Sequence, residues 1–300
     1  GAYEVQTEQC RVQSGDALGG IHHFCIRSGK VEDASVSSLP AVIPDRLLLV
    51  AASGIPEFRP VFDALSTIEV YNLNPREIGA MQKPDPGDLL RRDGSNAASV
   101  LQQFPPEVRE RLTANLSRIV PGVSDAEAKT LGSQETIEFR QTVKGQQHPW
   151  RFLAGAMSDG TLRAFGVLLA VFQAAATRSG RPSPALIGLE EPEMALHPAA
   201  ASVLLSALRE GSEHCQILVT SHSADLLDNS DIPTESLLAV DARDGLTRIG
   251  PIDEAGRSML RDRLFTPGEL LRQNQLAPDE TTFSDVKYEQ QLRLFEGNGE

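Results

Sequence analysis

Three clusters of polar residues in the second half of the chain have the chemistry to act on a phosphate group. Ser158-Asp159-Gly160 stands at the expected start of a helix, where backbone N–H groups, a hydroxyl and the helix dipole favour an anion. Glu190 and Glu191 end an apolar run, so that one carboxylate can hold Mg²⁺ while the other orients a water for attack on a phosphoryl group. His222 follows a second apolar run and could hydrogen-bond a γ-phosphate.

Each cluster, taken by itself, also has a purely structural interpretation. Two glutamates can form a solvated strand-to-loop junction, a histidine can cap or pack, and Ser158 can be an ordinary N-cap. Glu193 and His197 have the i, i+4 spacing of a metal pair, but prolines flank them and no third ligand is near, so the pattern favours a loop over a zinc site. The combination of the three clusters is what favours a functional interpretation.

Short strands and helices alternate around these clusters. The apolar runs 185–189 and 216–220 predict short buried strands, and the run 236–240 predicts a third strand. Residues 162–176 and 199–210 predict the helices that precede and separate the first two. Strands alternating with helices imply parallel strands joined by right-handed crossovers. Since ligands bind at the carboxyl ends of such strands, Glu190, Glu191 and His222 are expected at one edge of a sheet.

Upstream of these clusters the sequence predicts further strands and helices, and residues 1–80 are interpreted as scaffold because they contain no catalytic constellation. Period-two alternation and turn residues predict strands at Tyr3–Glu8, Ile21–Arg27, Ile68–Tyr71 and Thr136–Val143. Apolar residues at helical spacing predict a helix at Pro105–Val120. A helix is also expected at Phe58–Leu65, and another starts at Gly94–Leu101 with Ser95 or Asn96 as its N-cap.

Composition excludes several classes of protein. The 300 residues are 40% hydrophobic, which is enough for a real core, and no apolar run has the length of a membrane span. Three cysteines without a CxxC pair argue against a zinc ribbon and fit a reducing compartment, so a cytoplasmic location is expected. The net charge of −13 gives no global attraction to nucleic acid.

Four segments together resemble the motifs of ABC-type ATPases, in the order and spacing of that family. Met157–Arg163 resembles the signature motif, Leu186–Glu193 the Walker B strand, Met194–Pro198 the D-loop, and Ile217–His222 the switch-histidine strand. The residues of these motifs are most similar to those of the RecF/SMC-like branch of the family, which includes AAA-type ATPases (AAA_21) and the ATPase domains of OLD-type nucleases. The resemblance implies an α/β fold with a parallel P-loop-NTPase core, an antiparallel β lobe and a helical signature lobe.

The resemblance also implies a role for each matching residue. Glu190 would bind Mg²⁺, Glu191 would orient the attacking water, and His222 would sense the γ-phosphate. Ser158, Asp159 and Gly160 would contact ATP held by a partner subunit, and His197 would line the seam of that homodimer. The cofactors would be ATP and Mg²⁺, and the coupled process would be DNA repair or phage defence, acting on DNA or on a separate effector protein.

One departure from the family pattern is large: no G-x-x-x-x-G-K-[ST] P-loop occurs in the 300 residues. Residues 1–80 are therefore interpreted as the remainder of a β-rich nucleotide-binding lobe whose Walker A segment lies upstream. Residues 81–165 are expected to form the helical signature lobe, 166–278 the Walker B and switch core, and 279–300 a polar tail. The alternative is an ATPase-fold scaffold or interaction module that does not bind nucleotide.

Overall fold

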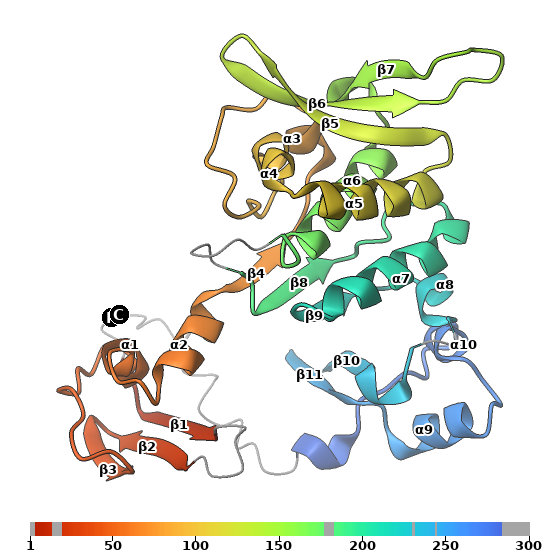
Figure 1. Ribbon diagram of the computed structural model, residues 1–300. Helices are drawn as coiled ribbons and strands as arrows, with labels where there is room; N and C mark the ends of the chain where they lie inside the picture. The colour runs from red at the N-terminus through yellow and green to blue at the C-terminus, as the bar shows by residue number, and fades with distance from the viewer. Residues whose placement is uncertain (1–3, 14–19, 177–182, 230–231, 244, 284–300) are drawn as a thin grey trace, which may run out of the picture. The chain divides into compact units, whose positions relative to one another are not determined.

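The computed structural model describes residues 4–13, 20–176, 183–229, 232–243 and 245–283, and Figure 1 labels their helices and strands. The chain divides into two compact units. The first unit comprises Gly1–Pro192 with Ala207–Thr220, and the second comprises Glu193–Ser206 with Ser221–Glu300. Parts of the expected loop at 179–184 and of the tail at 279–300 lie outside the described residues. The four expected segments of the chain stay a prediction.

A three-stranded parallel sheet forms the centre of the first unit. Its order is β4 (Ile68–Tyr71), β8 (Leu186–Glu190) and β9 (Gln216–Thr220), with both neighbouring pairs parallel. The central strand β8 buries Ile187, Gly188 and Leu189, as its apolar sequence predicts. The edge strand β9 alternates between exposed and half-buried residues, so the expectation of a buried strand there is wrong. Both boundaries of β9 and of β4 are as predicted.

The third strand of this sheet is not the one expected from the sequence. The run at 236–240 lies in β10 (Leu238–Arg243), which pairs antiparallel with β11 (Leu246–Pro251) in a separate ribbon of the second unit. Only two residues, Asp244-Gly245, separate these strands, and that dipeptide is a strong hairpin signal. A parallel crossover needs a far longer connection. The place beside β8 is taken by β4, which precedes it by more than a hundred residues.

Among the described residues, an antiparallel lobe and four helices lie between β4 and β8 in the chain. The lobe's sheet has the order β5 (Val123–Leu131), β6 (Gln134–Gln141) and β7 (Trp150–Leu153). The helices are α3 (Pro75–Gly79), α4 (Ala97–Gln103), α5 (Pro106–Ile119) and α6 (Asp159–Phe172), and Ala154–Ala156 is a 3₁₀ turn. Phe139 of β6 meets Phe165 of α6 edge to face at 5.4 Å, which joins this sheet to the long buried helix that the sequence predicted.

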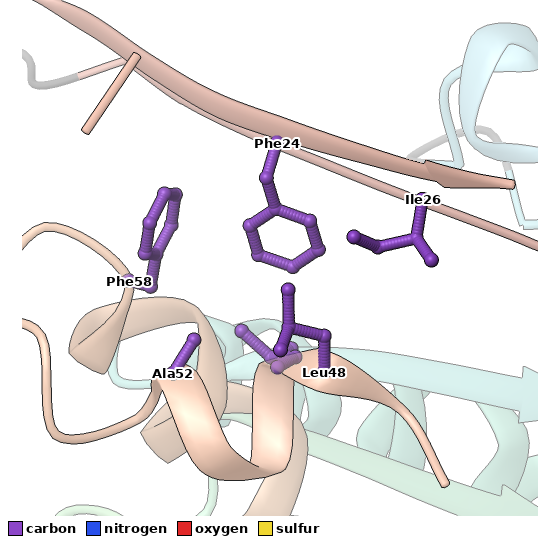
Figure 2. Packing of buried hydrophobic residues seen from close by; sticks show 6 residues of the cluster. Phe24, Ile26, Leu48, Ala52 and Phe58 are labelled. Atoms are coloured by element: carbon purple, nitrogen blue, oxygen red, sulfur yellow. The ribbon is translucent and has the colours of Figure 1, made fainter. Parts of the chain in front are cut away.

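The N-terminal part of the first unit has its own small core. A meander of β1 (Thr7–Gln13), β2 (Ile21–Arg27) and β3 (Lys30–Ala34) packs on α1 (Leu48–Ala52), which α2 (Arg59–Ser66) follows. Figure 2 shows Phe24 and Ile26 of β2 facing Leu48 and Ala52, with Phe58 beside them. The first strand begins later than the expected Tyr3–Glu8. Its Glu8 accepts the backbone N–H groups of Leu48 and Leu49 at 2.6 and 2.9 Å, which caps α1 from a distance.

The second unit is built from short helices and the β10–β11 ribbon. Its helices are α8 (Ala224–Leu227), α9 (Glu254–Arg261) and α10 (Pro267–Arg272), with 3₁₀ turns at Pro198–Ala200, Thr234–Ser236 and Glu280–Phe283. Helix α7 (Ala201–Ser212) has residues in both units. Arg272 of α10 joins Asp225 and Asp228 at 3.0 and 2.8 Å, which ties α10 to α8. Among the described residues, no helix is long and apolar enough to cross a membrane.

Candidate functional site

Polar side chains gather at the carboxyl edge of the parallel sheet. Glu190 is the last residue of β8, is exposed to solvent, and stands in register with Thr220 at the end of β9. Asn72, which directly follows β4, donates a hydrogen bond from Nδ2 to Glu190 Oε2 at 2.9 Å. All three strands thus contribute a polar residue to one edge, and the Glu190 carboxylate is oriented by a neutral amide. The expectation that Glu190 lies at a strand end is confirmed.

Glu191 adopts a backbone conformation that L-residues rarely use. Its φ angle is 43°, in the left-handed region, and its N–H donates to the Thr220 carbonyl oxygen at 3.0 Å. The ladder between β8 and β9 is therefore extended by one residue before the chain turns sharply into the buried Pro192. A non-glycine residue in this region costs folding free energy, and such residues cluster at functional sites. Ser28, Ala195, Arg263 and Asn274 also have positive φ angles. The side chain of Glu191 is half-buried.

The residues of the signature-like segment start α6 as the sequence predicted. Ser158 is the N-cap, and its Oγ accepts from the Thr161 N–H at 3.2 Å and shares a hydrogen bond with Thr161 Oγ1 at 2.9 Å. Ser158 and Asp159 are exposed, and Gly160 is half-buried. The first turn of a helix has N–H groups without intrahelical acceptors, so this exposed turn can receive an anion.

The two histidines belong to the second unit. His222 is exposed and lies between Ser221 and Ser223 in the loop after β9. His197 is also exposed, and its Nδ1 accepts from the Ala199 N–H at 3.2 Å, so the imidazole caps the turn at Pro198–Ala200. No group of three or more His, Cys, Asp or Glu with the geometry of a metal site occurs among the described residues.

Two contacts of this region were missed by the sequence reasoning. The first is the bond from Asn72 to Glu190, for which the signal was a polar residue directly after the apolar strand Ile68–Tyr71. The second is a hydrogen bond from Ser221 Oγ to Glu193 Oε1, which joins the loops after β9 and β8 within the second unit. No sequence signal pairs these two residues, because they stand 28 positions apart in separate loops.

Comparison with known proteins gives one family match and several structural similarities. The model of the family described as "AAA domain, putative AbiEii toxin, Type IV TA system" matches residues 61–228, more than half of the chain. The matched range contains Asn72, the signature-like segment, Glu190, Glu191 and His222. No curated protein matches the chain.

The solved structures that resemble the chain include several SMC head domains. An SMC head from Thermotoga maritima has 14% identity and a TM-score of 0.42, covering 82% of this chain and 74% of that one. An SMC head bound to the C-winged helix domain of ScpA has 12% identity and a TM-score of 0.49, covering 85% and 79%. An SMC head with a coiled coil from Pyrococcus yayanosii has 17% identity and a TM-score of 0.39. The match covers 53% of this chain but only 29% of the length of the SMC chain.

Proposed function

Because the chain belongs to the family of AAA domains described as putative AbiEii toxin, Type IV TA system, we propose that it hydrolyses ATP to ADP and phosphate with Mg²⁺. The match confirms the expected resemblance to AAA-type (AAA_21) domains. Together with the parallel sheet and the antiparallel lobe, it also confirms the expected α/β fold class. The single observation that carries the proposed activity is the acidic strand end, where Glu190 is oriented by Asn72 and Glu191 has a strained backbone.

Glu190 has the chemistry that a magnesium ion requires. Mg²⁺ prefers oxygen ligands, retains several waters, and is held in nucleotide sites by one or two carboxylates together with substrate phosphates. Glu190 offers an exposed carboxylate at the strand end, and the Asn72 amide fixes one of its oxygens without adding a competing positive charge. The ion would neutralise the negative charge that develops on the phosphates during transfer.

Glu191 is the residue we assign to the attacking water. A carboxylate accepts the hydrogen bonds of a water and orients its lone pair towards the γ-phosphoryl group. Holding the residue in a left-handed conformation fixes the direction in which its side chain leaves the strand end. The bond from its N–H to Thr220 anchors the backbone at that point, so that little reorganisation is needed during the reaction.

The remaining assignments describe a dimer with composite sites. Ser158, Asp159 and Gly160 at the start of α6 would contact the γ-phosphate of ATP bound by a partner subunit, His197 would line the dimer seam, and His222 would sense the γ-phosphate. The exposure of Ser158, His197 and His222 is compatible with these roles. We propose further that hydrolysis in the cytoplasm drives DNA repair or phage defence through DNA or a separate effector protein.

The test uses the full-length natural protein and the Glu191→Gln variant. Glutamine keeps the shape of the side chain but cannot act as a base, so kcat should fall by about 10²-fold or more while ATP remains bound. Size-exclusion chromatography with light scattering should then show an ATP-dependent dimer that persists. The matched control is Glu213→Gln, an exposed glutamate in the first unit, which should hydrolyse ATP like the wild type. Unchanged hydrolysis in Glu191→Gln contradicts the proposal.

A second candidate function is a protein-binding module that does not bind nucleotide. It is favoured by one observation: the 300 residues contain no P-loop motif, which supplies most of the phosphate cradle in this class of protein. Calorimetry of the 300-residue chain with ATP and Mg²⁺ separates the two functions. Micromolar binding contradicts the module, whereas binding that appears only in the full-length protein supports an ATPase whose cradle lies outside these residues.

A further inference from the structure

A chain of hydrogen bonds surrounds His222 in the second unit. Ser221 Oγ donates to Glu193 Oε1 and accepts from the Ser223 N–H at 3.0 Å. Ser223 Oγ in turn accepts from the Leu226 N–H at 3.2 Å and caps α8. The loop residues on both sides of His222 are therefore held through serine hydroxyls, and the chain ends on a carboxylate from the loop after β8.

The donor and acceptor roles in this chain are fixed by the single hydroxyl proton of Ser221. Because that proton goes to Glu193, the lone pairs of Ser221 Oγ are left to face the Ser223 N–H. A hydrogen bond to an ionised carboxylate is stronger than one between neutral groups, so Glu193 selects one rotamer of Ser221. That rotamer determines where the Ser223 N–H can donate its hydrogen bond. The backbone of His222 lies between Ser221 and Ser223 in the chain, so its position depends on this bond.

Glu193 begins the turn that leads towards His197. Its carbonyl oxygen accepts from the Leu196 N–H at 3.0 Å, and Ala195 within the turn has a left-handed φ of 65°. The side chain of Glu193 is half-buried, and its Oε2 is buried without a hydrogen-bond partner among the described residues. Burying a carboxylate oxygen in this way is costly, so the contact is not an efficient means of stabilising the turn. This cost favours a positional role over a purely structural one.

We propose that Glu193 and Ser221 are positioning residues that hold His222 in its working orientation and couple it to the loop after β8. The proposal rests on the proposed ATPase function, and it assigns a role to two residues outside the set Glu190, Glu191 and His222. Through this bond, a displacement of the turn at 193–197 moves Ser221 and, with it, the loop that carries His222. The D-loop-like segment and the switch histidine would thus respond together.

The kinetic test uses the full-length protein with Ser221→Ala, Ser221→Thr and Glu193→Ala, and the double alanine variant. Misplacing a reacting group by a small distance costs up to about 10²-fold, so we expect kcat of Ser221→Ala to fall at least about 10-fold. The KM for ATP should stay within about twofold, because His222 would act on the reacting phosphate after binding. Ser221→Thr keeps the hydroxyl and should retain most of the wild-type kcat. Since one bond links the two residues, the double variant should fall no further than Glu193→Ala alone.

Hydrogen exchange gives a readout that does not depend on catalysis. The Ser223 amide donates to Ser221 Oγ, so exchange over residues 222–226 should become several-fold faster in both Ser221→Ala and Glu193→Ala. The matched control is Ser206→Ala, because Ser206 Oγ bonds the Ser202 carbonyl within α7 at 2.9 Å and takes no part in the loop. Its exchange over residues 222–226 should equal that of the wild type.

The possible results separate this proposal from the ATPase assignment. If the wild type hydrolyses ATP, Glu191→Gln abolishes the activity, and Ser221→Ala keeps the wild-type kcat, only the positioning role is overturned. The positioning role is also overturned if the fold-losses of kcat in the two single alanine variants multiply in the double variant, because the two residues would then act independently. If the wild type does not hydrolyse ATP, both proposals are overturned.

Discussion

Replacing Glu191 by glycine should stabilise the protein while destroying its activity. Glu191 has a φ of 43°, and the left-handed region costs an L-residue about 1–2 kcal/mol. Glycine enters that region without a Cβ clash but loses about 0.5–1 kcal/mol more backbone entropy on folding. The net gain in the free energy of unfolding is therefore about 0.75 kcal/mol, the difference between the central values of these two ranges. The variant lacks the carboxylate assigned to the water, so ATP hydrolysis should be lost.

The adjacent residue provides a matched control with the opposite expected sign. Glu190 lies within β8, where glycine weakens a strand by about 0.5–1 kcal/mol. Glu190→Gly also removes the acceptor of the Asn72 amide, which contributes about 0.5–1.5 kcal/mol. The two glycine variants should thus differ in stability by about 2.5 kcal/mol, although each removes one glutamate side chain and the two positions are adjacent.

Urea and thermal unfolding of both variants, followed by circular dichroism, measure this difference. For chains of 150–250 residues, 1 kcal/mol shifts the melting temperature by about 2–4 °C. Glu191→Gln and Glu191→Ala complete the set, because both remove the carboxylate yet keep a Cβ, and neither should gain the stability of glycine. A loss of stability in Glu191→Gly as large as that in Glu190→Gly refutes the reasoning, since the backbone of Glu191 would then be unstrained.

Three further predictions concern the surroundings of the site and the lobe next to it. Asn72→Ala should raise the Mg²⁺ concentration that gives half-maximal ATPase rate by about 10-fold, because the Glu190 carboxylate loses its orienting amide; an unchanged metal dependence contradicts this role. Burial acts to raise the pKa of Asp85, but hydrogen bonds from Gly87 and Asn96 and the Arg91 guanidinium outweigh it and hold the pKa below its ordinary 3.8. The stability that the ionised Asp85 contributes is therefore present above pH 3.8 and is lost as the pH falls through the lower pKa of the folded state. Melting temperatures measured between about pH 2 and 6 should therefore fall less steeply with acid in Asp85→Asn than in the wild type, and equal slopes would contradict this contribution. Gly94→Ala should be about 1–3 kcal/mol more destabilising in urea than Gly132→Ala, since both have positive φ but only at Gly94 would a Cβ meet a side chain, Ile78, at 2.6 Å; equal losses would show that Ile78 can move aside.

The edge of the parallel sheet could be predicted from sequence because local signals there agree with one another. The run Ala185–Leu189 is uniformly apolar, as a central strand requires, and the charges that follow mark its end. The same holds for α6, whose N-cap Ser158 and long apolar stretch gave both its start and its burial. In these places, the local sequence by itself indicates both the type of element and its position along the chain.

The parts that sequence reasoning missed depend on pairing between distant segments. Strand β5 has the polar sequence Val-Ser-Asp-Ala-Glu-Ala-Lys-Thr-Leu, and it is a strand because β6 pairs with it across a two-residue turn. The run at 236–240 predicted a strand correctly but not its partner, since pairing depends on the two-residue connection that follows. The left-handed backbone of Glu191 likewise results from tertiary structure, because glutamate has no intrinsic preference for that conformation.

The pairing of β4 with β8 has a consequence for the order in which the molecule folds. Thr67 and Ala185 at one end of the pairing, and Asn72 and Glu190 at the other, are each 118 residues apart. Closing a flexible loop of that length costs about 4 kcal/mol by the logarithmic rule. The intervening sheet and helices reduce that cost if they assemble first, since a folded insert brings its own ends towards one another. The lobe should therefore form early, and the acidic edge should be among the last parts to become native. A partly folded molecule would then have the signature-like helix formed before the carboxylates at the strand end reach their native positions.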